Sequence, residues 1–354
     1  MFNRFCSADL PEKTAFYNPV TGKGFNGRIF MNGEETGNEG RAFAHILTGP
    51  EKGNAYQLPF LGRLFYENSL AHPNAGDKTI VISTDDSTPG QIYVYVGDKK
   101  DTGNPIEKAG LHGGKLFGVK VSNGGANYAS STVAIENAGV INGSFSLAEL
   151  SAVETKTGAQ LQTDSVAAGI TQFARPEDDA WDTKNPNVFY FVTTGGLGQT
   201  ARLYKLTLYS LSNPTGGSIE LVIDSTLLIG DDGQNARSFD NIAVDGDGNV
   251  MVQEDPGNTP YIAKVWKIDP VAKTGIQIFK SDPARFQAPA PAPYTVDEEN
   301  SGIIDVTDIV KSANWYQPFR RYYLGVMQAH YPNADAELVE GGQLYIMASP
   351  APRH

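Results

Sequence analysis

The chain has 354 residues, of which 40% are hydrophobic, and it contains 38 glycines and 21 prolines. This length and turn-rich composition predict one large globular domain, or two ordinary ones, with an ample core. The formal net charge is −12 and no basic stripe is visible, so nucleic acid is excluded as the expected partner.

Cysteine content and hydropathy exclude two further classes of protein, those held together by disulfides and those that span a membrane with a long apolar stretch. A single cysteine, Cys6, excludes an internal disulfide framework. No stretch approaches the roughly 18 apolar residues of a membrane span, so none is predicted. The opening MFNRFCSADLPEK lacks the apolar core of a secretory signal, so an exported protein would carry its signal outside this sequence.

One arrangement of residues recurs along the chain in altered form. It begins with an acid or an acid–amide pair, continues through a turn-rich cluster and a β-rich run, and ends in acidic or hydroxyl residues. The clearest copies are RLFYENSLAHPNAGDKTIVISTDD (63–86) and ARPEDDAWDTKNPNVFYFVTT (174–194), with weaker relatives in GRIFMNGEE, which ends at Glu34 and Glu35, and ENSGIIDVTDIV near the end.

The spacing of these units predicts the fold. Their head residues Glu67, Glu177 and Asp240 are unevenly spaced, which excludes a tight solenoid but permits a propeller with excursions. We therefore predict an all-β chain that forms a single β-propeller domain over residues 1–354, with five or six blades. Residues 137–168 are predicted to be an insertion, partly helical around SFSLAELSAV, and the Pro/Ala-rich residues 287–294 an exposed connector.

The stretch SFDNIAVDGDGNVMVQEDPGN contains an apparent calcium loop. Its DGDGN core starts like an EF-hand loop, but that loop needs glycine at position six and a bidentate glutamate at position twelve. Val250 and Pro256 occupy those positions. The sequence instead predicts a hairpin in which Asp245 and Asp247 are turn residues.

The acidic unit ends suggest a shared cation site. In a propeller the innermost strand of every blade lines the axis, so equivalent unit ends would bring several carboxylates together. Such a cluster repels itself unless it binds cations or takes up protons, and Ca²⁺ accepts about six to eight oxygen ligands. The alternative is that these acids are separate, solvated strand ends.

Several motifs resemble those of the PhoX-type alkaline phosphatases. They are RIFMNGEE, RLFYENS…ISTDD, RPEDDAWD, SFDNIAVDGDGNVMVQED and ENSGIIDVT, in that order. The resemblance implies a secreted or periplasmic β-propeller that hydrolyses phosphate monoesters at an axial site holding calcium and, in some members, ferric iron. It also implies metal-facing residues at Glu34, Glu35, Glu67, Glu177, Asp240, Asn241 and Glu254.

The chain departs from the family pattern in two places. Typical members read CEE where this chain reads GEE, so Gly33 stands at the position of the iron-ligating cysteine, while Cys6 lies upstream in RFCS. Iron is therefore less expected than calcium. Related chains also carry an additional region before RFCS that is absent from this sequence.

The resemblance assigns the catalytic roles to Arg175 and Glu177. Arg175 would hold phosphoryl oxygens through its planar guanidinium, and Pro176 between the two residues would fix its direction. Arg237 and Lys264 are further cations near unit ends and are predicted to contact substrate. The expected partners are small phosphate esters, and the protein is expected to be a monomer.

Two other functions remain open at this point. DNIAVDGDGNVMV also resembles blades of gluconolactonase-type enzymes, which favours a calcium-dependent lactonase or esterase as the second enzyme class. The third class is a non-catalytic propeller whose calcium ions are structural and whose surface binds another molecule.

Overall fold

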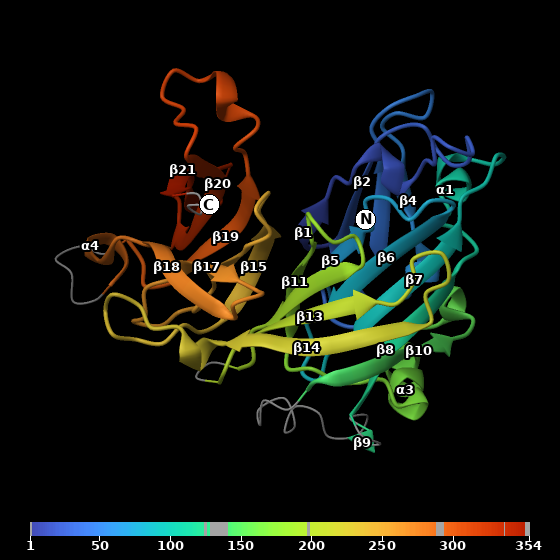
Figure 1. Cartoon of the computed structure of the whole chain (residues 1–354), viewed down its shortest axis with the longest axis horizontal. Helices are drawn as coiled ribbons and strands as arrows, with labels where there is room; N and C mark the ends of the chain where they lie inside the picture. The colour runs from blue at the N-terminus through green and yellow to red at the C-terminus, as the bar shows by residue number, and fades with distance from the viewer. Residues whose placement is uncertain are drawn as a thin grey trace. The chain divides into compact units, whose positions relative to one another are not determined.

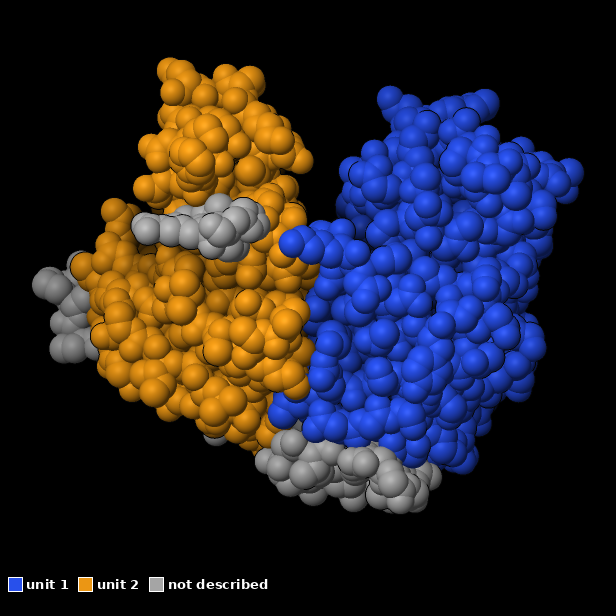
Figure 2. Space-filling view, viewed as in Figure 1, with its two compact units in different colours: residues 1–191, 204–221 blue, residues 192–203, 222–354 orange. Residues whose placement is uncertain are grey.

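The computed structural model describes residues 2–123, 126–127, 141–196, 199–287, 294–335 and 337–350. The chain folds into two compact units, residues 1–191 with 204–221 and residues 192–203 with 222–354, which Figure 2 draws in blue and orange. That the whole chain forms a single propeller domain stays a prediction. Of the predicted connector, residues 288–293 lie outside the described part of the chain.

The predicted all-β class is confirmed, because strands dominate the described residues and pair into four antiparallel sheets (Figure 1). The first sheet consists of β1 (Phe5–Asp9), β2 (Ile29–Glu34), β3 (Ala42–Ile46) and β4 (Ala55–Gln57). The third consists of β15 (Phe239–Val244), β16 (Val250–Glu254), β17 (Lys264–Asp269) and β18 (Thr274–Lys280), and the fourth of β19 (Glu298–Asp305), β20 (Arg320–Pro332) and β21 (Glu340–Pro350).

The second sheet is built from two meanders joined by one strand. The first meander runs through β5 (Tyr66–Ala71), β6 (Lys78–Asp85), β7 (Ile92–Asp98) and β8 (Lys115–Asn123), and the short β9 (Ala126–Asn127) pairs with β8. The second runs through β11 (Pro176–Trp181), β12 (Val188–Thr193), β13 (Arg202–Leu208) and β14 (Gly216–Asp224). With the other three sheets, the described residues thus contain five meanders, and meanders of this kind are the unit of a propeller blade.

Helices are short and few in the described residues. They are α1 (Pro105–Lys108), α3 (Gly158–Ala168) and α4 (Pro283–Phe286), with 3-10 turns at Lys13–Ala15, Pro59–Leu61, Val153–Thr155, Ser225–Leu227 and Val310–Ser312. None of these helices is long and apolar enough to cross a membrane.

The strand β10 (Gly143–Leu150) corrects the expectation of helix around SFSLAELSAV. It pairs antiparallel with β8 on one side and with β14 on the other, so it joins the two meanders of the second sheet (Figure 1). As a strand, this segment also satisfies backbone N–H and C=O groups at the edges of β8 and β14, which a helix would leave unpaired. Helix begins only at α3, where Thr157 and Gln160 form a capping box.

The core of the first unit lies on both faces of the β5–β8 meander. Along β6, Ile80 and Ile82 pack into one hydrophobic cluster and Val81 packs into another. A strand buried on both faces has a continuous apolar sequence, which is why TIVIS does not alternate between apolar and polar residues. The face containing Val81 packs with residues of the first sheet such as Met31 and Ile46.

The DGDGN segment is a hairpin turn between β15 and β16, as predicted. Asp245 is fully buried, and its carboxylate accepts hydrogen bonds from the backbone N–H groups of Asp247 (2.8 Å) and Asn249 (2.9 Å) and from the Tyr323 hydroxyl (2.9 Å). Asp247 pairs with the guanidinium of Arg321, whose Nε donates to Oδ2 at 2.8 Å. Internal donors thus occupy the oxygens that an EF-hand loop would direct at calcium.

We predict that Asp245→Ala lowers the free energy of unfolding by about 2–4 kcal/mol, because it leaves two part-buried N–H groups and the buried Tyr323 hydroxyl without their acceptor. Denaturant unfolding of the purified variant measures this loss. Asp308→Ala is the matched control, since Asp308 is exposed and pairs with Lys311 three residues on. Equal stabilities of the two variants would contradict the structural role of Asp245.

Candidate functional site

The candidate site of the first unit lies where β5 and β11 begin. Each strand carries a glutamate as its second residue, Glu67 in β5 and Glu177 in β11, and both side chains are buried. The two strands are the ends of the path through the second sheet, yet Asn68 Nδ2 donates to Asp178 Oδ1 at 2.7 Å, so they lie side by side (Figure 1). A carboxylate oxygen of Glu67 therefore comes within 4.8 Å of one of Glu177.

A sulfur donor joins the carboxylates at Glu67. Because β1 pairs with β2, Cys6 lies beside the end of β2, and its Sγ is 3.6 Å from Glu67 Oε1. One ligand atom each of Cys6, Glu35 and Glu67 lie within 4.8 Å of one another, a grouping that could hold a metal ion. The Ser7 hydroxyl donates to the same Glu67 oxygen at 2.8 Å.

Gly33, which stands at the family's cysteine position, has no room for a side chain. A Cβ atom there would lie 2.4 Å from Cβ of Tyr66 and 2.5 Å from its Cγ. Tyr66 is itself fixed, because its buried hydroxyl donates to the carbonyl oxygens of Leu61 (3.0 Å) and Gly62 (3.1 Å). The thiol near Glu35 and Glu67 thus comes from β1 and not from β2.

Burial dominates the electrostatics of Glu67. Its side chain is 1% exposed, and desolvation, reinforced by the charge of Asp178, raises its pKa from 4.5 to about 8. Burial likewise raises the pKa of Glu35, although the Arg4 guanidinium opposes the shift. A bound cation would remove the cost of ionising both groups.

Arg175 is held beside Glu177 by an unusual backbone. Its φ of 57° lies in the left-handed region, which is strained for a residue with a side chain and is typical of functional sites. Its Nη2 lies 2.7 Å from Glu177 Oε1, and its Nε and Nη2 donate to the two oxygens of Asp86 at 2.8 and 3.2 Å. The predicted proximity of Arg175 and Glu177 is therefore present in this unit.

Glu34 is placed differently from Glu35. Both of its oxygens accept from the Arg41 guanidinium, at 2.7 and 2.6 Å, and one also accepts from the Asn3 N–H. Burial alone would raise the pKa of Glu34, but these partners outweigh it and the pKa lies below its ordinary value. In this arrangement Glu34 forms an ion pair with Arg41, and its assignment as a metal ligand stays a prediction.

The remaining predicted ligands belong to the second unit. Asp240 is the second residue of β15, the position that Glu67 and Glu177 occupy in their strands. The side chain of Asn241 accepts from the Gly302 N–H at 3.1 Å, which links β15 to β19.

Glu254 is surrounded by donors. It accepts from Trp266 Nε1 (2.9 Å), the Tyr261 hydroxyl (3.0 Å) and the N–H groups of Arg237 and Lys264 (both 2.9 Å). Burial still raises its pKa to about 7. Within its own unit, Glu254 is a hydrogen-bonded core residue.

The two additional cations contact the ring of Tyr261. The Arg237 guanidinium lies 4.0 Å and the Lys264 ammonium 3.7 Å from the ring centroid. Lys264 is fully buried and pairs with Asp232 at 3.0 Å. Their assignment to substrate binding remains a prediction, and for Lys264 it would require breaking this ion pair.

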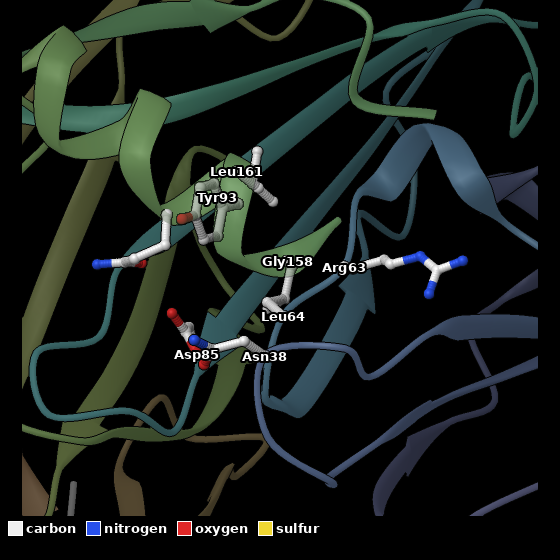
Figure 3. A pocket seen from close by; sticks show the side chains of 8 residues that line it. Asn38, Arg63, Leu64, Asp85, Tyr93, Gly158 and Leu161 are labelled. Carbon is white, nitrogen blue, oxygen red and sulfur yellow. The ribbon is translucent and has the colours of Figure 1, made fainter. Parts of the chain in front are cut away.

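A small cavity lies near Asp85, at the end of β6 (Figure 3). Its volume is about 10 Å³, and Asn38, Tyr93 and Leu161 are among its lining residues. That is about the space of one water molecule and far too little for a phosphate ester. Burial raises the pKa of Asp85 to about 7.

Comparison with known proteins identifies the family. The sequence model of the family described as alkaline phosphatase PhoX matches residues 48–263, more than half of the chain. The chain therefore belongs to the alkaline phosphatase PhoX family. No curated protein matches the sequence.

Solved structures support the fold. The structure of Pseudomonas fluorescens PhoX in complex with vanadate, a transition-state analogue, matches with a TM-score of 0.57 at 15% identity. The match covers 87% of this chain and 57% of that one, so this chain spans little more than half the length of that relative. This likeness confirms the predicted β-propeller class. A periplasmic gluconolactonase from Pseudomonas aeruginosa matches over 95% of this chain and 86% of its own, at 10% identity and a TM-score of 0.33, too low to carry an argument.

Sequence reasoning did not place three residues in the first unit's site, although it named Cys6 and left its role as a ligand open. Ser7 and Cys6 contact Glu67, which lies 60 and 61 residues further along the chain, and no local sequence pattern predicts these contacts. Asp86, the partner of Arg175, did carry a signal, because it belongs to the acidic pair that closes the unit ISTDD.

We predict that metal-free protein loses stability as pH rises from about 5 to 8. The folded-state pKa of Glu67, about 8, exceeds its ordinary 4.5, so the stability is fully present below pH 4.5 and is lost as pH rises through the folded-state pKa. Each proton released costs at most about 1.4 kcal/mol per pH unit. Urea unfolding at several pH values in chelator measures the slope.

Glu67→Gln should reduce this slope by up to about 1.4 kcal/mol per pH unit, the share of one group, whereas Glu149→Gln should leave it unchanged. Glu149 is half-exposed and pairs with Lys115 at 2.8 Å. The same slope in wild type and Glu67→Gln would show that Glu67 does not hold a proton in the folded protein.

Proposed function

We propose that this protein is a metal-dependent phosphomonoesterase that releases phosphate from small organic phosphate esters. The observation that carries the proposal is the Arg175 guanidinium, held 2.7 Å from Glu177, whose carboxylate neighbours that of Glu67. A dianionic ester needs positive charge near its phosphoryl oxygens. The guanidinium supplies one positive charge, and a metal ion bound by the carboxylates would supply more. Membership of the alkaline phosphatase PhoX family supports the same reaction.

The donor chemistry supports metal binding. Glu35, Glu67 and Glu177 offer hard carboxylate oxygens of the kind Ca²⁺ prefers, and we propose calcium as the principal ion. Cys6 adds a soft thiol, a donor that suits transition metals, and this supports iron as a second ion despite Gly33. We propose Asp240, Asn241, Glu254 and Glu34 as further ligands on the family pattern alone. When bound, such ions neutralise phosphoryl charge and activate the attacking oxygen.

Arg175 would bind the phosphoryl group. A guanidinium presents donors in a rigid plane and can hold two oxygens of a phosphate at once. Pro176, directly after it, restricts the backbone and so keeps the guanidinium close to Glu177. Because the transition state carries more charge on these oxygens than the ground state, the contact favours the reaction and not only binding.

We also propose that the protein acts as a monomer in the periplasm or outside the cell. Membership of the alkaline phosphatase PhoX family supports this location.

Arg175→Ala should lower the turnover of p-nitrophenyl phosphate by roughly 10²–10³-fold, as expected for the loss of one preorganised donor in the transition state. Arg175→Lys should recover only part of the rate, because an ammonium cannot form the planar fork. Arg63→Ala is the control, since the Arg63 side chain is half-exposed and pairs with Glu39 at 3.1 Å. Full activity in Arg175→Ala would refute the phosphatase role given to this residue.

Chelation should lower both the melting temperature and the activity, and added Ca²⁺ should restore them. A ligand at about 100 times its Kd stabilises the folded state by about 2.7 kcal/mol, which differential scanning calorimetry detects. Glu67→Gln should lower the metal content measured by mass spectrometry. Asp77→Asn should not, because Asp77 pairs with Lys23 near the surface. An unchanged melting temperature in excess chelator would count against a shared metal site.

A further inference from the structure

We infer that Asp86 is a positioning residue that aims the Arg175 guanidinium at the phosphoryl site, an inference that rests on the proposed function. Asp86 follows the last residue of β6, and Arg175 precedes the first residue of β11. The two meet side-on, with Nε donating to Oδ1 at 2.8 Å and Nη2 to Oδ2 at 3.2 Å. A side-on pair fixes the plane of the guanidinium, which a single contact with Glu177 would leave free to rotate.

The backbone brings these two residues together independently of their side chains. Gly90 and Phe173 exchange two backbone hydrogen bonds, of 2.9 and 2.7 Å, and the Arg175 N–H donates to the Ser87 carbonyl at 3.1 Å. The Asp86 N–H in turn donates to the carbonyl of Phe65, directly before β5, at 2.9 Å. The segment 86–90 is thus tied both to the start of β5 and to the approach to β11.

Glycine at position 90 makes this close approach possible. A Cβ atom on Gly90 would lie 2.0 Å from the carbonyl oxygen of Asp85 and 2.6 Å from Cδ of Pro176. Any side chain at this position would push the segment away from the Arg-Pro-Glu sequence. The Asp86–Arg175 distance therefore depends on a backbone contact that only glycine permits.

In the Asp86–Arg175 pair, the carboxylate is shielded from water. Asp86 is 5% exposed and Arg175 38%, so the carboxylate is buried while the guanidinium reaches toward solvent. Burial of the acceptor limits screening by water and strengthens the orientation of the donor. The charge of Asp86 also acts on Glu67 and Glu35, whose pKa values it helps to raise. A test must therefore separate an effect on Arg175 from an effect on metal binding.

The test is Asp86→Asn, which keeps the shape of the side chain but places an amide N–H₂ against one donor of the fork. With saturating Ca²⁺ we expect kcat/KM for p-nitrophenyl phosphate to fall about 10- to 100-fold, the usual cost of losing an orienting partner, and the inhibition constant of inorganic phosphate to rise. Metal content should match that of wild type. Asp98→Asn is the control, because Asp98 is exposed and pairs with Lys78 at 2.6 Å in the same unit.

A double-mutant cycle distinguishes positioning from a general structural effect. If Asp86 acts through Arg175, then Asp86→Asn should add little to the loss already caused by Arg175→Ala. Full additivity of the two losses would overturn the inference, as would an Asp86→Asn enzyme within about twofold of wild type.

A readout without activity keeps the inference separate from the proposed function. The Nε–H resonance of Arg175, identified in arginine-labelled protein by its loss in Arg175→Ala, should exchange slowly with solvent in wild type and much faster in Asp86→Asn. Equal exchange rates would overturn the positioning role whatever the enzyme's activity. If exchange behaves as expected but metal-loaded wild type neither turns over esters nor binds phosphate, the proposed function fails and the Asp86–Arg175 orientation stands.

Discussion

Desolvation of carboxylates is the constraint on which the candidate site depends. A buried carboxylate must receive donors, a counter-charge, a proton or a cation. Asp245 and Glu254 are surrounded by donors from their own unit, and Glu34 is paired with a guanidinium. Glu67 has the Ser7 hydroxyl and a thiol, and its pKa rises to about 8. Burial raises the pKa of Glu254 as well, to about 7, so the two carboxylates differ in the number of hydrogen-bond donors around them rather than in the direction of the pKa shift.

Short-range patterns were enough to predict strands such as β6 and β16 and the hairpin between β15 and β16. The runs TIVIS and NVMVQE are β-rich, and DGDG between two such runs is a turn on stereochemical grounds alone. The strand β10 escaped prediction because polar and apolar residues alternate only over the short run SFSL, while LAELSAV contains good helix formers, and its partners β8 and β14 are separate segments of the sequence. Tertiary pairing here overrides local propensity.

The site was predictable only where its residues are neighbours in the sequence. Arg175 and Glu177 are separated by one proline, so their proximity follows from the motif. Arg175 and Asp86 are 89 residues apart, and their pairing depends on how segment 86–90 meets the start of β11. Family resemblance placed Glu254 among the predicted metal ligands, but it could not show how many hydrogen bonds that carboxylate accepts within its own unit.

The strand β10 also has a consequence for the solubility of the folding chain. Before it docks, β8 and β14 each present a row of unsatisfied N–H and C=O groups, which are templates for pairing with a second molecule. In the folded unit, residues 143–146 of this segment pair with β14 and residues 144–150 pair with β8. A segment that reads as an insertion in the sequence therefore covers two strand edges that would otherwise be open to pairing with a second molecule.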